Sequence, residues 1–156
     1  MPNWCEGTLK VRGTFENLKK FVMNGLQPVA DLGCDTTPLE VFNNDETYFF
    51  AISHSSHLYI KHTHRHFCES KYIEFCVDEP GEITILTLPM KAAWGMNANG
   101  LLNCCVEFHL DMKIQGFERG MEFSQIIEIV DGSIIQDDEI KYDNWNWDCP
   151  CPDLGG

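Results

Sequence analysis

Hydrophobic and polar residues alternate near the start of the chain, in residues 4–12. Leu9 and Val11 lie on one side of an extended chain, and Thr8 and Lys10 lie on the other. Side chains of a strand point alternately to opposite faces, so this pattern is typical of a strand with one buried face. The sequence therefore predicts a strand at 4–12 whose leucine and valine enter the core.

The hydrophobic spacing becomes helical directly after this strand. Thr14 is a suitable N-cap, Glu16 lies in the first turn, and Gly25 supplies a stop. The apolar residues that recur at intervals of three and four positions are Phe15, Leu18, Phe21 and Val22. We therefore expect an amphipathic helix at 14–24, and this strand followed by a helix is the clearest local prediction from the sequence.

Most of the remaining chain has the composition of strands. We expect strands where aromatic and β-branched residues cluster or alternate with polar ones, at 48–52, 57–64, 72–77, 83–88, 105–114 and 121–130. Asp131-Gly132 is typical of a hairpin turn. Pro and Gly punctuate residues 26–47, which predicts a loop with room for one helical turn after Pro38, and residues 97–102 have room only for a short helix.

These elements predict an α+β fold with an antiparallel-rich sheet and one main N-terminal helix. The 156 residues correspond to one domain on the usual scale of about 100–200 residues, and 44% hydrophobic residues are enough for a core. We divide the chain into an α+β domain at 1–136 and an acidic, aromatic C-terminal segment at 137–156. The Pro- and Gly-containing end of this segment is expected to be loose.

Charge is strongly unbalanced along the chain. The sequence holds 24 acidic and 11 basic residues, for a net charge of −13, and residues 67–156 account for seventeen of the acids and five of the bases. This balance argues against direct binding to a nucleic-acid backbone or to an anionic membrane. An acidic surface attracts basic partners, including the nucleic-acid channels of other proteins, although it can also serve only to keep the protein soluble.

Two further features bear on location. No run of about 18 apolar residues is present, and the first residues lack the basic and apolar regions of a signal peptide. We therefore expect a soluble protein of the cytoplasm.

The first residues resemble a known family. Met1-Pro2-Asn3-Trp4-Cys5-Glu6, followed by Leu9, Val11 and Gly13, resembles the start of the YubB-type ferredoxin-like proteins of phages and plasmids. The similarity continues in patches at 59–67, 93–95 and 117–132. His62 stands where the family usually has Gly, and Gly95-Met96-Asn97 replaces its Ser-Pro-Pro. The resemblance implies a ferredoxin-like core and an origin in a mobile element, which makes the expected location the host cytoplasm. It transfers no catalytic residues.

The C-terminal segment combines spaced carboxylates with aromatic residues that are favoured as interface anchors. We expect the partner-binding residues to be Asp137, Asp138, Glu139, Asp143, Trp145, Trp147 and Asp148. On a strand, Trp145 and Trp147 would face the same way. Carboxylates along an edge can occupy the phosphate sites of a nucleic-acid-binding protein. In the alternative interpretation, the two tryptophans fold back onto the core and the acids face water.

Histidines and cysteines are the other candidate ligands. His62, His64 and His66 would share one face of a strand, where they could bind zinc with His54, His57 or Cys68, or simply form a solvated edge. The cysteines show no paired C-x-x-C spacing, and we expect buried free thiols: Cys5, Cys34, Cys68, Cys76, Cys104, Cys105, Cys149 and Cys151. We predict no metal site and no cofactor.

The sequence contains no nucleophile elbow, papain-like cysteine motif or P-loop, so we do not expect an enzyme. The leading hypothesis is an accessory protein of a phage or similar element that binds and inhibits a host defence protein. The expected partner is a nucleic-acid-guided nuclease with a basic surface, which would make the chain an anti-CRISPR-like, acidic nucleic-acid mimic. Two alternatives remain: a metal- or small-ligand-binding module or enzyme that uses the His and Cys clusters, and a structural component of a virion.

Overall fold

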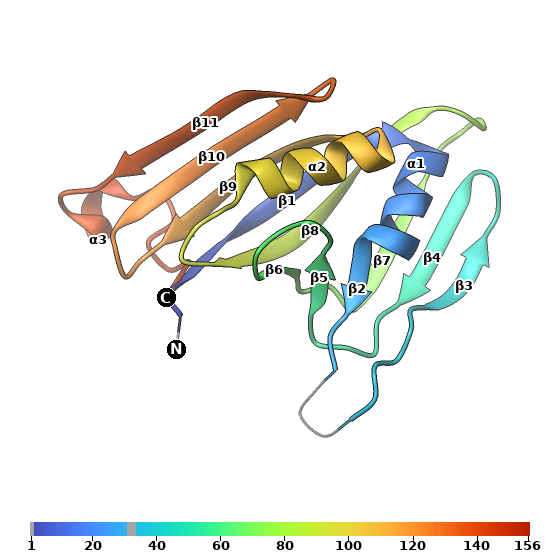
Figure 1. Ribbon diagram of the computed structural model, residues 1–156, viewed down its shortest axis with the longest axis horizontal. Coiled ribbons are helices and arrows are strands. Elements are labelled where there is room, and N and C mark those ends of the chain that lie inside the picture. Colours follow the sequence, from blue (N-terminus) through green and yellow to red (C-terminus); the bar gives the residue numbers. More distant parts are fainter. Residues whose placement is uncertain (1, 31–33) are drawn as a thin grey trace.

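A computed structural model describes residues 2–30 and 34–156 and has an α+β architecture rich in antiparallel strands (Figure 1). Eight strands form the main sheet in the order β11 (Ser133–Lys141), β10 (Phe123–Val130), β9 (Asp111–Glu118), β1 (Trp4–Thr14), β8 (Ile83–Ala93), β6 (His66–Cys68), β5 (Leu58–Ile60) and β2 (Leu26–Pro28). A smaller sheet has the order β3 (Glu40–Asn44), β4 (Tyr48–Ile52) and β7 (Tyr72–Cys76). Neighbouring strands are antiparallel in both sheets.

The register of β1 fixes which face of the main sheet is buried. Leu9 lies opposite Leu88 of β8 and Ile114 of β9, and all three are buried. One position along, Lys10 lies opposite Lys113 and points to the other, more open face. The alternation of Leu9 and Val11 with polar residues therefore predicted this strand correctly.

The first helix, α1 (Phe15–Lys20), continues directly into a π-helix, Phe21–Gly25. Its N-cap is Thr14, whose Oγ1 accepts a hydrogen bond from the Asn17 N–H at 3.3 Å. The apolar residues at helical spacing are buried, as expected, and pack into the core. The smaller sheet packs against this helix, since the Phe15 and Phe75 rings lie 5.2 Å apart.

A second helix, α2 (Ala98–Phe108), lies with α1 on the same face of the main sheet (Figure 1). The Asn97 Oδ1 accepts from the Gly100 N–H at 2.8 Å, and the helix ends at His109, whose φ is 54°. The expected strand at 105–114 is wrong in its first half, because α2 continues to Phe108. Residues buried at helical spacing determine this: Leu101, Cys104, Cys105 and Phe108.

Two other expectations need correction. Residues 26–47 contain β2 and β3 rather than a loop with a helical turn, although residues 31–33 of that segment lie outside the described residues, as does Met1. The expected strand at 57–64 ends at Ile60, because His62 and Arg65 have φ values of 68° and 52° in a turn that leads to β6. Left-handed backbone of this kind cannot continue a strand.

The C-terminal end is also ordered rather than loose. The boundary expected between residues 136 and 137 falls inside β11, and α3 (Trp145–Asp148) follows that strand. The last residues then lie beside the start of β1: the Trp4 N–H donates to the Gly156 oxygen at 3.2 Å, and the Gly156 N–H donates to the Trp4 oxygen at 3.0 Å. The two ends of the described chain therefore lie together (Figure 1).

Candidate functional site

The predicted acidic residues of the C-terminal segment lie on β11, the outermost strand of the main sheet. Asp137, Asp138 and Glu139 are all exposed. Asp137 and Glu139 share one face, where the Asp137 Oδ1 accepts from the Gln125 Nε2 at 3.1 Å. Asp138 points to the other face and accepts from the Gln136 Nε2 at 2.7 Å. The edge therefore presents carboxylates on both sides.

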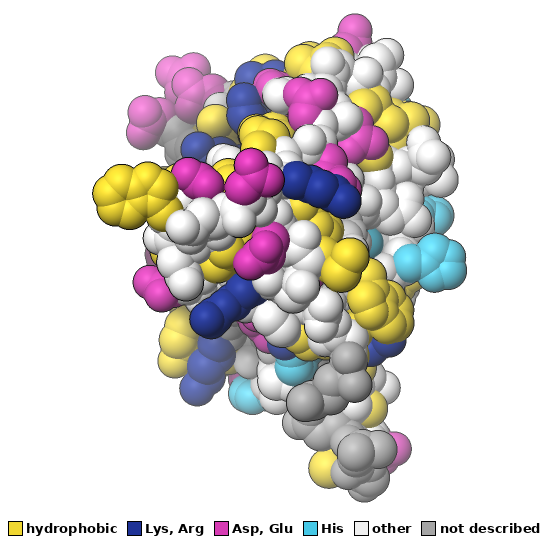
Figure 2. Space-filling model, turned by 90° about the vertical axis from the view of Figure 1, so that its left-hand side faces the viewer, with side chains coloured by type: hydrophobic (Ala, Val, Ile, Leu, Met, Phe, Trp, Pro, Cys, Tyr) yellow, Lys and Arg dark blue, Asp and Glu magenta, His cyan; other side chains and the backbone are white. Residues whose placement is uncertain are grey.

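Basic residues are scarce around this edge. Residues 117–156 hold ten acidic residues, and their two basic residues are Arg119 and Lys141. The Lys141 Nζ lies 3.9 Å from the Glu139 Oε1, a long contact between two exposed groups. Figure 2 views this side of the molecule, where acidic side chains lie among apolar ones and several Lys and Arg side chains. Residues 117–156 therefore carry an excess of acidic charge, part of which is offset from other segments, as where the Lys113 Nζ lies 3.1 Å from the Glu128 Oε2.

The remaining predicted residues lie at α3 and are not brought together as expected. Trp145 is 3% exposed and its Nε1 donates to the Pro152 oxygen at 2.8 Å, whereas Trp147 is 85% exposed. Side chains two positions apart on a helix point about 200° apart, so the expectation that both rings face the same way is wrong. Trp145 packs into the fold, while Trp147, Asp143 and Asp148 face water.

The three alternating histidines do not share a face. His66 is buried in β6, His64 is exposed, and the His62 Nε2 contacts the Glu107 Oε2 on α2. The turn at residues 61–65 reverses the backbone, so the three histidine side chains point to different sides. Within residues 2–30 and 34–156, no group of three or more His, Cys, Asp or Glu side chains is arranged to hold a metal ion.

The cysteines are free thiols, and five of them are buried: Cys5, Cys68, Cys104, Cys105 and Cys149. Burial raises the pKa of Cys5 and of Cys104 to about 12, and it also raises the pKa values of the other three. A thiol with so high a pKa is protonated at neutral pH and is a poor nucleophile. These five residues therefore act as small apolar groups, as expected. The expectation of burial is wrong for the other three, because Cys34 and Cys76 are exposed and Cys151 is half-buried.

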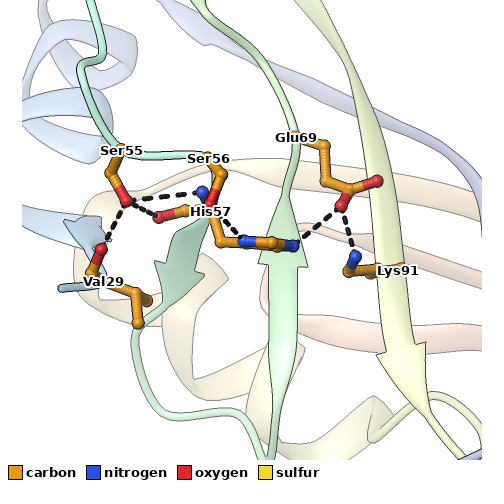
Figure 3. A network of polar contacts seen from close by, with 6 residues as sticks. All are labelled: Val29, Ser55, Ser56, His57, Glu69 and Lys91. Carbon is orange, nitrogen blue, oxygen red and sulfur yellow. Dashed lines mark hydrogen bonds and ion pairs between the residues drawn. The ribbon is translucent and has the colours of Figure 1, made fainter. Parts of the chain in front are cut away.

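A polar network that sequence reasoning missed lies near the other end of the main sheet (Figure 3). The Ser56 Oγ lies 2.7 Å from the His57 Nδ1, and the His57 Nε2 lies 2.9 Å from the Glu69 Oε1. The same Glu69 oxygen forms an ion pair with the Lys91 Nζ. Ser56 and His57 come just before β5, Glu69 follows β6, and Lys91 is in β8.

The backbone around His57 is held in place from two sides. The Val29 N–H donates to the His57 oxygen at 3.0 Å, and the Ser55 Oγ lies 2.8 Å from that oxygen and 2.5 Å from the Val29 oxygen. In the sequence, His57 stood out only as one of several candidate zinc ligands. Nothing in a serine–histidine pair twelve residues before a glutamate indicates that the three side chains meet.

Comparison of the chain with protein-family models, with curated proteins and with solved structures found no match. In the part of the chain that the structure describes, no helix is long and apolar enough to span a membrane.

Proposed function

We propose that the chain is a binding protein whose acidic edge, defined as Asp137, Asp138 and Glu139 of β11 with the exposed Trp147, occupies a basic nucleic-acid-binding surface of a partner protein. The observation that carries this proposal is the run of three exposed carboxylates on the outermost strand, in a region with few basic residues. Alternate residues of a strand are on the order of 7 Å apart, so Asp137 and Glu139 place two negative charges at that spacing on one face of the edge, and Asp138 adds a third on the other face.

Such a row attracts lysine and arginine side chains that otherwise hold phosphates. Exposed charges act mainly on the association rate, and added salt screens them. The exposed indole of Trp147, on the helix α3 that follows β11 in the chain, supplies apolar contact area that a free phosphate backbone lacks. The acidic edge therefore offers both the charge and a hydrophobic anchor for a basic groove.

We propose further that the core is ferredoxin-like with an enlarged sheet. This is supported by the order β9–β1–β8: since β8 and β9 are each antiparallel to β1, they run parallel to each other with β1 between them, and α2 connects them. A helix connecting two parallel strands that flank a third is the split β-α-β arrangement of ferredoxin-like folds. Together with the resemblance of residues 1–13, it favours an accessory protein of a mobile element, with a nucleic-acid-guided nuclease as partner.

The test measures target cleavage by a panel of purified nucleic-acid-guided nucleases, each loaded with its guide, with and without the protein. We expect inhibition of at least one nuclease, weakened about tenfold or more by higher salt and by a variant in which Asp137, Asp138 and Glu139 are changed to Lys. The control variant makes the same change of charge at Asp35, Asp45 and Glu46, which lie far from β11 in the sequence and are exposed.

Two outcomes would overturn this proposal. Cleavage by every nuclease in the panel could be unaffected, which removes the proposed partner class. Alternatively, both triple variants could inhibit as well as the unchanged protein at low and at high salt, which removes the acidic edge as the binding surface.

A further inference from the structure

Ser56, His57 and Glu69 have the order of contacts that nucleophilic catalysis by a hydroxyl requires: a nucleophile beside a base, and the base beside an orienting group. We propose that they form a site that hydrolyses small polar carboxylic esters, an activity independent of the acidic edge. The contacts are 2.7 Å from the Ser56 Oγ to the His57 Nδ1 and 2.9 Å from the His57 Nε2 to the Glu69 Oε1.

The partners of His57 determine where its proton lies. An ionised carboxylate only accepts hydrogen bonds, so the neutral imidazole donates its Nε2–H to Glu69. The Nδ1 then carries a lone pair, and it can only accept from the Ser56 hydroxyl. Ser56 therefore points its proton at a base that is ready to take it, with the two ring nitrogens used in the opposite order from chymotrypsin-like triads.

The surrounding elements hold the base and the carboxylate in this geometry. Glu69 lies between His57 and Lys91, as Figure 3 shows, and Lys91 belongs to the long central strand β8. The Phe67 ring packs edge-on against the imidazole, with ring centroids 5.8 Å apart. Lys91 and His57 both contact the same Glu69 oxygen, and the carboxylate stabilises the imidazolium that forms when His57 takes a proton.

A hollow adjoins the hydroxyl and gives a substrate access. Its volume is about 470 Å³, and it is lined by Ser53, His54, Ser55, Ser56, Glu69 and Lys71. The lining residues are polar or charged, and they include Lys71, whose Nζ lies 5.5 Å from the centroid of the Tyr72 ring. The hollow therefore suits a small polar ester, whose carbonyl oxygen gains negative charge during attack in a hollow that a lysine lines.

The reaction has two stages. In the first, the Ser56 Oγ bonds to the ester carbonyl carbon as its proton passes to the His57 Nδ1, and the carbonyl electron pair moves to oxygen. The carbonyl then re-forms, the bond to the alcohol oxygen breaks, and that oxygen takes the proton from Nδ1. In the second, water gives a proton to Nδ1 and bonds to the acyl carbon; the Ser56 Oγ leaves and recovers the proton. The net change is ester plus water to acid plus alcohol.

The experiment combines covalent labelling with kinetics on the full chain. A fluorophosphonate should label the protein at one site, Ser56, with loss of fluoride, as mapped by peptide mass spectrometry. Hydrolysis of p-nitrophenyl acetate should show a burst followed by turnover. Changing Ser56→Ala should remove the label and lower kcat/KM on the order of 100-fold or more.

Glu69 acts through His57 as a positioning residue, so its test uses the pH profile. Changing Glu69→Gln removes the negative charge beside the imidazole, and the pH of half-maximal kcat/KM should move lower while circular dichroism stays unchanged. The control variant is Ser133→Ala, an exposed serine at the start of β11, which lies outside the hollow. It should keep the label and the rate.

Several results would overturn the proposal. Absence of labelling and of turnover in the unchanged protein removes the activity. A label at another residue removes Ser56 as nucleophile, and an equal rate in the folded Ser56→Ala protein assigns hydrolysis to imidazole alone. A Glu69→Gln variant with an unshifted pH profile removes the role of the carboxylate.

Discussion

His66 connects β6 to the start of α2, and replacing it tests whether a buried imidazole holds these elements together. The side chain is 1% exposed. Its Nδ1–H donates to the His64 oxygen at 2.6 Å, and its Nε2 accepts from the Asn97 N–H at 2.8 Å. Because Asn97 is the N-cap of α2, the imidazole holds the residue from which that helix begins.

The change His66→Phe keeps a flat ring of similar size and removes both hydrogen bonds. It leaves the His64 carbonyl and the Asn97 N–H beside an apolar ring, and a buried polar group without its partner costs about 1–3 kcal/mol. Both groups are only part-buried, so water replaces some of the lost bonding, and the expected loss in the free energy of unfolding is about 1–3 kcal/mol in total. In a chain of this size, such a loss lowers Tm by about 2–12 °C.

The same geometry predicts a pH dependence. Burial lowers the pKa of His66 below its usual value of 6.5, because the charged imidazolium loses hydration there and Nε2 can no longer accept from Asn97. The unfolded chain therefore binds a proton more readily than the folded one. The contribution of neutral His66 to the free energy of unfolding is therefore fully present above pH 6.5. It falls as the pH is lowered toward the pKa that His66 has in the folded protein.

The assay is urea unfolding followed by tryptophan fluorescence at pH 7.5 and at pH 5.5. The unchanged protein should lose more stability between these pH values than His66→Phe does, and the difference isolates His66 from the other histidines. A control variant, His64→Gln, changes an exposed side chain and should match the stability of the unchanged protein at pH 7.5. A His66→Phe variant within about 0.5 kcal/mol of the unchanged protein, with the same pH dependence, would refute the reasoning.

Two further perturbations test the packing of the sheet and of the C-terminal segment. Changing Trp145→Ala should lower the free energy of unfolding in urea by about 3–5 kcal/mol, because the indole is buried and hydrogen-bonded to Pro152. Changing the exposed Trp147→Ala should alter it by less than about 0.5 kcal/mol. Equal losses in the two variants would contradict the burial of Trp145 and the exposure of Trp147. Changing Gly7→Ala puts a Cβ 1.9 Å from the Gln115 oxygen, so β1 must move away from β9. This should lower the free energy of unfolding by about 1–3 kcal/mol or more. An unchanged Tm in a thermal scan would contradict this close approach of the two strands.

Local pattern was sufficient for several elements of this fold. The alternation around Leu9, the helical spacing from Phe15 and the Asp131-Gly132 turn each predicted what the structure contains, because each depends on residues close in sequence. The same holds for the strands expected at 48–52, 72–77 and 83–88. The exposed carboxylates of β11 were also identified as exposed from sequence, since charged residues rarely enter a core without a partner.

Local pattern failed where packing against distant residues decides the outcome. Alternating apolar residues between Val106 and Met112 suggested one strand, yet the core buries Cys105 and Phe108 and leaves Val106 55% exposed, so a helix ends and a strand begins within that run. Trp145 and Trp147 have equal hydrophobicity, and only the docking of α3 on the sheet distinguishes the buried ring from the exposed one.

The proposed nucleophilic site shows the same limit most clearly. Ser56 and His57 precede β5, Glu69 follows β6, and Lys91 lies in β8, so the side chains meet only because these three strands pair side by side. Strand pairing depends on which distant segments together bury their apolar faces, and a single sequence carries no local signal for that choice. Periodicity and turn residues in the sequence determined the individual helices and strands. The packing of their apolar faces against one another in the tertiary structure decided which polar side chains came into contact.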